Sequence, residues 1–270
     1  MLYFHLFPVD TMQNKPFFPI QALLLRIYKW LVIAPILTLT TIVLCSTMTI
    51  VSMLGAPDFA SRVFATLWAR INLLAMLCKV DVLRSGHVIP GQPYVVVANH
   101  QSLIDIYVIY GKLNMDIKWV MKKELEKVPF LGTACKKMGH ILIDRGDSLG
   151  AQQSIEDARA RIMRGNSVVF FPEGTRSRDG QLLQFKKGAF RLALELGLPV
   201  LPVTIDGTGK VLPSDTMHWQ PGHLRLIVHD PISTDGMTAK DVNHLRDATK
   251  AAINSGLQCH QPTGPNTLTL

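Results

Sequence analysis

The sequence predicts an α/β fold, with a mostly parallel central sheet flanked by helices and with N-terminal membrane-anchoring helices. Three observations predict it. From residue 81 onward, short β-branched runs alternate with helical stretches, as in sheets covered by helices. Near the N-terminus, residues 30–54 contain no charged side chain. Polar clusters follow two of the apolar runs, where strands are expected to end at a ligand-binding edge.

Composition narrows the class of partner. The chain has 270 residues, enough for one α/β domain with an appendage. Its net charge of +8 indicates an anionic partner. Nucleic acid, an anionic membrane surface and phosphorylated substrates all qualify. The basic residues are dispersed and are not interleaved with aromatic residues, which argues against nucleic acid. The mean hydropathy of +0.21 favours membrane contact.

Cysteine and histidine spacing predicts no metal site and no disulfide framework, and we separately expect no bound cofactor. The four cysteines lie far apart without a Cys-x-x-Cys pair, so a reducing compartment is expected. Several histidines likewise have no partner at ligand spacing. These residues are Cys45, Cys78, Cys135, Cys259, His87, His140, His218, His223 and His229.

The N-terminal part is expected to hold a tail over 1–20 and a helical membrane anchor over 21–80. The uncharged run 30–54 is about 25 residues long, enough to cross a bilayer with some tilt. It is too long for a removable signal peptide. Gly55–Asp58 then breaks the helix. A full span, a hairpin dipping into one leaflet and a buried hairpin of a soluble protein remain open.

A second helix is expected over about 59–80. Arg62 and Arg70 lie on one face of this stretch, and four apolar side chains lie toward the other. The apolar residues are Val63, Leu67, Leu74 and Leu77. This pattern favours an amphipathic helix at the membrane interface over a second span.

The catalytic domain is expected over 81–255, followed by a flexible tail over 256–270. Apolar runs predict its strands, at 81–83, 94–98, 117–121, 141–143, 168–171, 200–205 and 224–228. Helical stretches alternate with them, at 103–110, 151–164, 188–195 and 238–253. Gly197 is placed to end the third of these helices, and Thr238 to cap the fourth.

The most informative motif is the spacing of His100 and Asp105, directly after the apolar run 94–98. A carboxylate one turn into the next element can accept a hydrogen bond from one imidazole nitrogen. That bond fixes the tautomer and leaves the other nitrogen to take a proton from an alcohol. Taken alone, such a pair is more often a loop hydrogen bond or a helix cap.

A second polar cluster follows the apolar run Val168–Phe171. Proline and glycine punctuate this turn, which carries Glu173 and Arg176. Because ligands collect at the carboxyl ends of strands, we expect this cluster and the His100–Asp105 pair at the same edge of the sheet.

Four ordered blocks resemble the glycerolipid acyltransferase family, most closely its 1-acyl-sn-glycerol-3-phosphate acyltransferases. The blocks are NHQSLID (Asn99–Asp105), GHILIDR (Gly139–Arg145), FPEGTRS (Phe171–Ser177) and VLPVTI (Val200–Ile205). The resemblance covers roughly residues 70–250. Leu142 stands where aromatic residues are common in the second block, and this departure touches no catalytic position.

The resemblance implies transfer of an acyl chain from acyl-CoA or acyl-carrier protein to the sn-2 hydroxyl of lysophosphatidic acid, giving phosphatidic acid. His100 is then the general base and Asp105 its orienting partner. No G-x-S-x-G nucleophile elbow occurs, so direct attack by the substrate hydroxyl is the simplest mechanism. The resemblance also implies an inner-membrane enzyme whose catalytic domain faces the cytoplasm.

The substrate-binding residues are expected in the second and third blocks and after a neighbouring strand. Arg176 and Arg145 present planar donor forks that match phosphate oxygens, although surface ion pairs would use the same groups. The resemblance assigns Glu173 to acceptor binding. Smaller contributions are expected from three further residues, each with an equally ordinary solvated or capping role: Gly174, Thr175 and Lys122.

Three alternatives remain at the level of sequence. A related acyltransferase would use another lysolipid, such as a lyso-ornithine lipid or a lysophospholipid. A lipid hydrolase would use His100 to activate water. A non-catalytic phospholipid-binding membrane protein would not need His100 and Asp105 together.

Overall fold

The computed structural model describes residues 19–84, 87–144, 150, 153–154, 156–157, 159, 162 and 165–258. The predicted N-terminal tail up to residue 18, most of the predicted helix over 151–164 and residues 259–270 lie outside the described residues.

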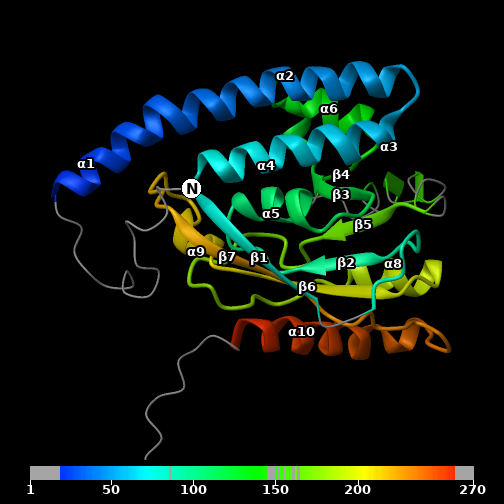
Figure 1. The fold of residues 1–270 in the computed structure, drawn as a ribbon. Helices are drawn as coiled ribbons and strands as arrows, with labels where there is room; N and C mark the ends of the chain where they lie inside the picture. Colours follow the sequence, from blue (N-terminus) through cyan, green and yellow to red (C-terminus); the bar gives the residue numbers. More distant parts are fainter. Residues whose placement is uncertain are drawn as a thin grey trace, which may run out of the picture.

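One long helix opens the described chain. It comprises α1 (Pro19–Tyr28), a π-helical turn η1 (Lys29–Ile33) and α2 (Ala34–Met53). Its stretch Ile20–Met53 is long and apolar enough to cross a membrane. At Gly55 the chain reverses with φ +93°, a conformation that glycine adopts without strain. The chain returns alongside α2 through α3 (Pro57–Ala60), η2 (Ser61–Ala65) and α4 (Thr66–Ala75), as Figure 1 shows.

The returning helix is shorter than the stretch 59–80 predicted from sequence. Helix α4 ends at Ala75, and Leu77 has φ +51°, which takes the backbone out of the helix. Strand β1 then begins at Cys78 and runs to Arg84, in parallel register with Gly222–Val228. Pairing with a distant strand therefore decides the conformation of residues 78–80, whose local pattern also fits a helix.

The described strands form one seven-stranded sheet in the order β1-β7-β6-β2-β5-β3-β4. All neighbouring pairs are parallel except β6 and β7. This confirms the predicted mostly parallel sheet. The strands after β1 are β2 (Val95–Ala98), β3 (Ile117–Lys122), β4 (Ile141–Ile143), β5 (Ser167–Phe170), β6 (Val200–Asp206) and β7 (Gly222–Val228).

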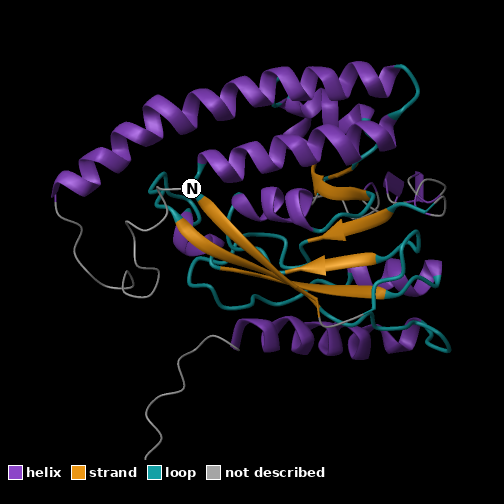
Figure 2. Ribbon diagram, in the orientation of Figure 1, coloured by secondary structure: helices purple, strands orange, loops and turns teal. Residues whose placement is uncertain are grey.

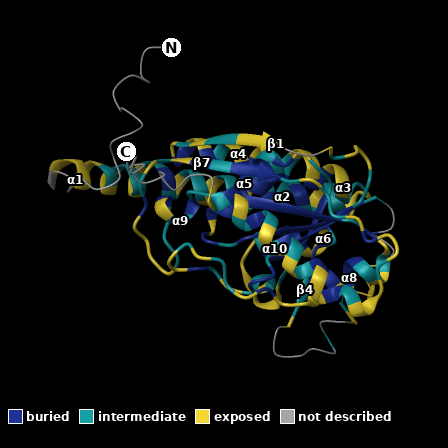
Figure 3. Ribbon diagram, turned by 90° about the horizontal axis from the view of Figure 1, so that it is seen from below, coloured by how far each residue is buried: buried dark blue, intermediate teal, exposed yellow. Residues whose placement is uncertain are grey.

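Helices cover both faces of the sheet, as Figures 1 and 2 show. One face carries α2, α4, α5 (Ile104–Lys112) and α6 (Leu131–Lys137), and the other carries α8 (Gly188–Leu196) and α10 (Val242–Gln258). Short helical turns complete the set: η3 (Lys123–Lys127), α9 (Thr208–Val211) and η4 (Ala239–Asp241). Figure 3 shows buried residues concentrated in the sheet and exposed residues along α1.

Two predicted helix boundaries are confirmed. Helix α8 stops at Gly197, whose φ of +61° places it in the left-handed conformation of a C-terminal cap. Before α10, the hydroxyl of Thr238 accepts from a backbone N–H and Asp241 returns a bond to the Thr238 N–H, a capping box.

The helical hairpin α1–α4 presents apolar side chains to its surroundings. Two of its arginines and one aspartate contact the domain: Arg62 pairs with Asp116, Arg70 donates to the Gly111 carbonyl at 3.0 Å, and Asp58 pairs with the buried amine of Lys118 at 2.7 Å. The outward face carries large exposed apolar residues, including Ile20, Leu23, Leu24, Trp30, Leu31, Leu39, Val43, Ile50, Met53, Leu54, Phe59, Leu67 and Leu74. Such a contiguous apolar surface is typical of contact with lipid or protein.

Candidate active site

The site lies at the carboxyl ends of β2 and β5, two strands that pair directly. Asn99 follows β2 and is fully buried. Its amide nitrogen donates to the Ile205 carbonyl and its oxygen accepts from the Ile205 N–H, each at 2.8 Å. This paired bond ties the end of β2 to β6 and fixes where the next residue, His100, leaves the sheet.

His100 and Asp105 form a hydrogen-bonded pair. The imidazole Nδ1 lies 2.8 Å from Asp105 Oδ2, which also accepts from the backbone N–H groups of Gln101 and Ser102 at 2.7 and 2.9 Å. An ionised carboxylate only accepts, so Nδ1 carries the proton. His100 Nε2 makes no hydrogen bond within the part of the chain that the structure describes. It is therefore the nitrogen that can accept a proton.

The imidazole plane is fixed by an aromatic neighbour. The rings of His100 and Phe171 stack with centroids 3.9 Å apart and planes 7° apart. Phe171 directly follows β5, and Trp119 on β3 packs against its ring at 5.4 Å. The sequence prediction missed this contact, although the position of Phe171 at the end of a predicted strand could have suggested it.

Glu173 acts on the backbone of the same loop. One carboxylate oxygen accepts from the His100 N–H at 2.8 Å, and the other accepts from the Leu183 N–H at 2.9 Å. Burial raises the pKa of the Glu173 carboxyl, while these two backbone donors oppose the rise. Glu173 therefore lies next to His100, but its two carboxylate oxygens accept hydrogen bonds from the protein backbone.

The turn after Glu173 requires a glycine. Gly174 has φ +74°, and a Cβ there would lie 2.9 Å from the Lys186 amine. A side chain at this position would therefore be strained and would displace the lysine. Thr175 is exposed to solvent on the same turn.

Arg176 binds an acidic residue. Its guanidinium lies 3.2 Å from Asp215, and Arg178 lies 2.9 Å from the same carboxylate. Asp215 belongs to the segment after α9 and was not predicted from sequence. Because carboxylate and phosphate present similar oxygen pairs, this contact shows that the Arg176 fork can hold an anion at this edge.

Of the two remaining predicted binding residues, Lys122 is not brought into this network. Lys122 ends β3, is exposed, and pairs with Glu124 at 2.9 Å. Arg145 lies outside the described residues. Within the described ranges, no group of three or more His, Cys, Asp or Glu side chains could hold a metal ion.

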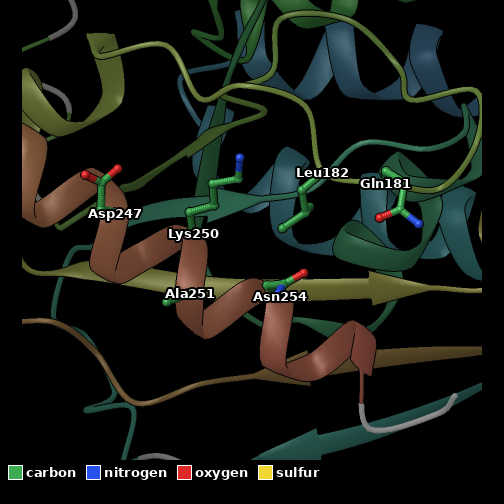
Figure 4. Close-up of a pocket in the computed structure, with 6 residues that line it drawn as sticks. All are labelled: Gln181, Leu182, Asp247, Lys250, Ala251 and Asn254. Atoms are coloured by element: carbon green, nitrogen blue, oxygen red, sulfur yellow. The ribbon is translucent and has the colours of Figure 1, made fainter.

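Two cavities are lined in part by residues of the segment 181–187. One, of about 560 Å³, is lined by Glu173, Leu183, Gln184, Phe185, Lys186, Lys187 and Arg246. The other, of about 380 Å³, lies between α10 and residues 181–182 and contains none of the predicted site residues (Figure 4). Only the first cavity therefore adjoins the predicted site.

The fold and the dyad together define a class of site. A histidine oriented by a buried carboxylate, with a free ring nitrogen at the carboxyl edge of a parallel sheet, has the geometry that general-base chemistry requires.

Comparison with known proteins names the family. The acyltransferase family model matches residues 79–206. A 1-acyl-sn-glycerol-3-phosphate acyltransferase of Chlamydomonas reinhardtii is 35% identical over 193 residues, covering 71% of this chain and 56% of that protein. The mouse 1-acyl-sn-glycerol-3-phosphate acyltransferase alpha is 34% identical over 179 residues, covering 65% and 62%.

The fold is also that of a solved enzyme. The crystal structure of the 1-acyl-sn-glycerophosphate (LPA) acyltransferase from Thermotoga maritima superposes with a TM-score of 0.74 at 27% identity, covering 88% of this chain and 95% of that one. Residues 79–206 of this chain therefore form a domain of the acyltransferase family model. The chain spans a little over half of the length of the curated relatives it matches.

Proposed function

We propose that this protein transfers an acyl chain from an acyl thioester to the sn-2 hydroxyl of lysophosphatidic acid, forming phosphatidic acid. The names of its relatives support the reaction class and acceptor. The observation that carries the proposal is the 2.8 Å bond between His100 Nδ1 and Asp105, which commits one ring nitrogen and leaves the other available.

In the proposed reaction His100 is the general base. The acceptor hydroxyl gives its proton to His100 Nε2 while its oxygen attacks the thioester carbonyl carbon. The tetrahedral intermediate then collapses, the C–S bond breaks, and the imidazolium returns the proton to the departing thiolate. Asp105 stabilises the imidazolium through its negative charge and holds the ring in the productive tautomer.

The acceptor phosphate is proposed to bind Arg176, whose guanidinium faces anions at this edge. Gly174 and Thr175 lie on the turn between this arginine and Glu173 and are proposed to line the phosphate site. We propose that Glu173 supports acceptor binding indirectly, by fixing the His100 backbone. Arg145 and Lys122 stay predicted contributors.

The helical hairpin is proposed to anchor the enzyme in a membrane. Helix α2 packs against α4 and α6, and its buried residues Cys45 and Met48 lie in the core of the domain, as does Ile33 at the end of the preceding turn η1. This packing supports a hairpin inserted in one leaflet. We propose the inner membrane, with the catalytic domain on the cytoplasmic side, acyl-CoA or acyl-carrier protein as donor, no bound cofactor, and a role in phospholipid synthesis.

The test is an acyl-transfer assay on membranes carrying the protein or its His100→Ala variant, with labelled acyl-CoA and a panel of lysolipids. We expect phosphatidic acid from the wild type and a loss of about 10²–10⁴-fold in the variant. His87→Ala, which alters an exposed histidine, is the control and should retain full activity.

Each product distinguishes a different function. Another diacyl lipid would keep the mechanism and move the acceptor to a different lysolipid. Free fatty acid alone would indicate a hydrolase. More than about a tenth of wild-type activity in His100→Ala would overturn the assignment of the base.

A further inference from the structure

Thr208 lies outside the four sequence blocks but touches the dyad. It is the first residue of α9, directly after β6, and is fully buried. Its hydroxyl donates to Asp105 Oδ1 at 2.5 Å. Gly207 precedes it with φ +90°, and a Cβ there would lie 2.7 Å from the His223 carbonyl oxygen. Only glycine fits this turn, so the backbone fixes where Thr208 enters the site.

The two oxygens of Asp105 have unequal support. Oδ2 accepts three bonds, from His100 Nδ1 and from two backbone N–H groups. Among the described residues, Oδ1 accepts only the Thr208 hydroxyl. The Asp105 side chain has no solvent exposure, so bulk water cannot replace that donor. The Thr208 bond therefore opposes rotation of the carboxylate and stabilises its charge from the side away from His100.

We propose that Thr208 is a positioning residue of the reaction. Hydrogen bonds link Thr208 to Asp105 and Asp105 to His100, and we call this chain of bonds the relay. This inference rests on the proposed function of the dyad. Thr208 does not touch substrate, and it acts by holding the carboxylate that holds the base. Without the hydroxyl, one oxygen of a buried anion has no donor. The dyad then binds a proton more readily, since a proton neutralises a less stabilised charge.

The experiment compares Thr208→Val, which keeps the shape but removes the hydroxyl, with Thr208→Ser, which keeps the hydroxyl. The control is Thr249→Val on α10, because Thr249 is equally buried and its hydroxyl bonds to the Leu245 carbonyl. Each variant is made in the full chain and assayed in membranes. The readouts are kcat, KM for both substrates and the pH dependence of the rate.

We expect Thr208→Val to lower kcat by about 10- to 100-fold, the size of a lost hydrogen bond to a charged group, with both KM values within about twofold. The acid limb of its pH–rate profile should move to higher pH. Thr208→Ser should stay within about threefold of wild type. Thr249→Val should change neither kcat nor the profile.

A second readout separates this inference from the proposed function. The rate at which diethyl pyrocarbonate modifies His100, followed by mass spectrometry across pH, needs no turnover. A wild type that forms no diacyl lipid would defeat the proposed function, while a shifted modification profile in Thr208→Val would still support the relay.

Unchanged kcat together with an unchanged modification profile in Thr208→Val would overturn the relay. Thr208→Cys is similar in size and has only a weak donor, so it gives the same comparison if valine lowers the yield of folded protein.

Discussion

The His100–Asp105 dyad and the Arg176–Arg178 pair follow neighbouring strands, but their side chains differ in exposure to solvent. The Asp105 side chain is fully buried and receives four hydrogen bonds from fixed donors. Arg178 is 82% exposed, and Asp215, which it shares with Arg176, is 50% exposed. Buried charges are screened little, whereas exposed ion pairs are worth ~0–1 kcal/mol and weaken with salt.

This difference in exposure matches the two roles proposed for these groups. The dyad is rigid enough to orient a proton acceptor, so its loss should appear in the rate of the chemical step. The arginine pair is exposed enough to exchange one anion for another, so its loss should appear in acceptor binding. The predictions below test this separation from the largest expected effect to the smallest.

Asp105→Asn should cause the largest loss. Asparagine can still accept from the backbone N–H groups of the loop, but it lacks the charge that stabilises the His100 imidazolium. We expect kcat to fall about 10²–10⁴-fold while acceptor KM changes by about twofold or less. Steady-state kinetics in membranes measure both.

The control for this change is Asp235→Asn, which removes the same charge in an exposed turn between β7 and α10. It should leave kcat unchanged. If Asp105→Asn raised acceptor KM and kept kcat, the buried carboxylate would be a binding group and the separation of roles would be lost.

A second histidine on the same face of the sheet sharpens the comparison. His140 is buried, its Nε2 lies 2.7 Å from the Tyr110 hydroxyl, and its Nδ1 accepts from the Trp119 N–H. Burial, followed by the positive charge of Lys118, lowers the pKa of His140 to about 3. Unlike His100, it has no carboxylate contact within the described part of the chain, and it stays neutral.

The low pKa of His140 makes the stability of the folded protein depend on pH. Below pH ~6.5 the unfolded chain binds a proton at this histidine, whereas the folded protein does not until about pH 3. The stability from neutral His140 is fully present above pH ~6.5 and is lost as pH falls toward 3, by at most ~1.4 kcal/mol per pH unit. Urea unfolding in detergent across this range should show the slope.

His140→Gln should flatten that slope, because glutamine keeps an acceptor and a donor but does not titrate. His87→Gln, at an exposed position, should leave it unchanged. An equally steep slope in His140→Gln would show that other groups cause the loss of stability in acid.

Sequence predicted the parts of this site that are local in the chain. The spacing of His100 and Asp105 sufficed, because Asp105 lies in the first turn of the helix that follows β2. Likewise, a Gly197 stop and a Thr238 cap depend only on neighbouring residues.

Contacts between distant segments could not be predicted in this way. Thr208 and Asp215 come to the site because β6 lies next to β2, an order set by packing of the whole sheet. The early start of β1 at Cys78 likewise depends on pairing with β7. Local patterns therefore predict the candidate site residues, whereas tertiary packing determines which distant residues contact them.

Arg176→Ala should have the smallest of the three effects and a different kinetic form. Its side chain is 27% exposed, so its contact with an acceptor phosphate is partly screened. We expect acceptor KM to rise about tenfold at low salt with kcat within about twofold. A group that binds the substrate equally in the ground state and the transition state changes KM alone. Arg178→Ala, at the more exposed partner of Asp215, is the matched variant and should raise KM by about threefold or less.

Salt gives the decisive comparison. Raising ionic strength from about 50 mM to about 500 mM should weaken acceptor binding in the wild type and close most of the gap to Arg176→Ala, because exposed charges are screened over a Debye length. The kcat defect of Asp105→Asn should persist at both salt concentrations, since its charge is buried. If salt removed the Asp105→Asn defect as well, or if Arg176→Ala lowered kcat without raising KM, the buried and exposed charges would not differ in role.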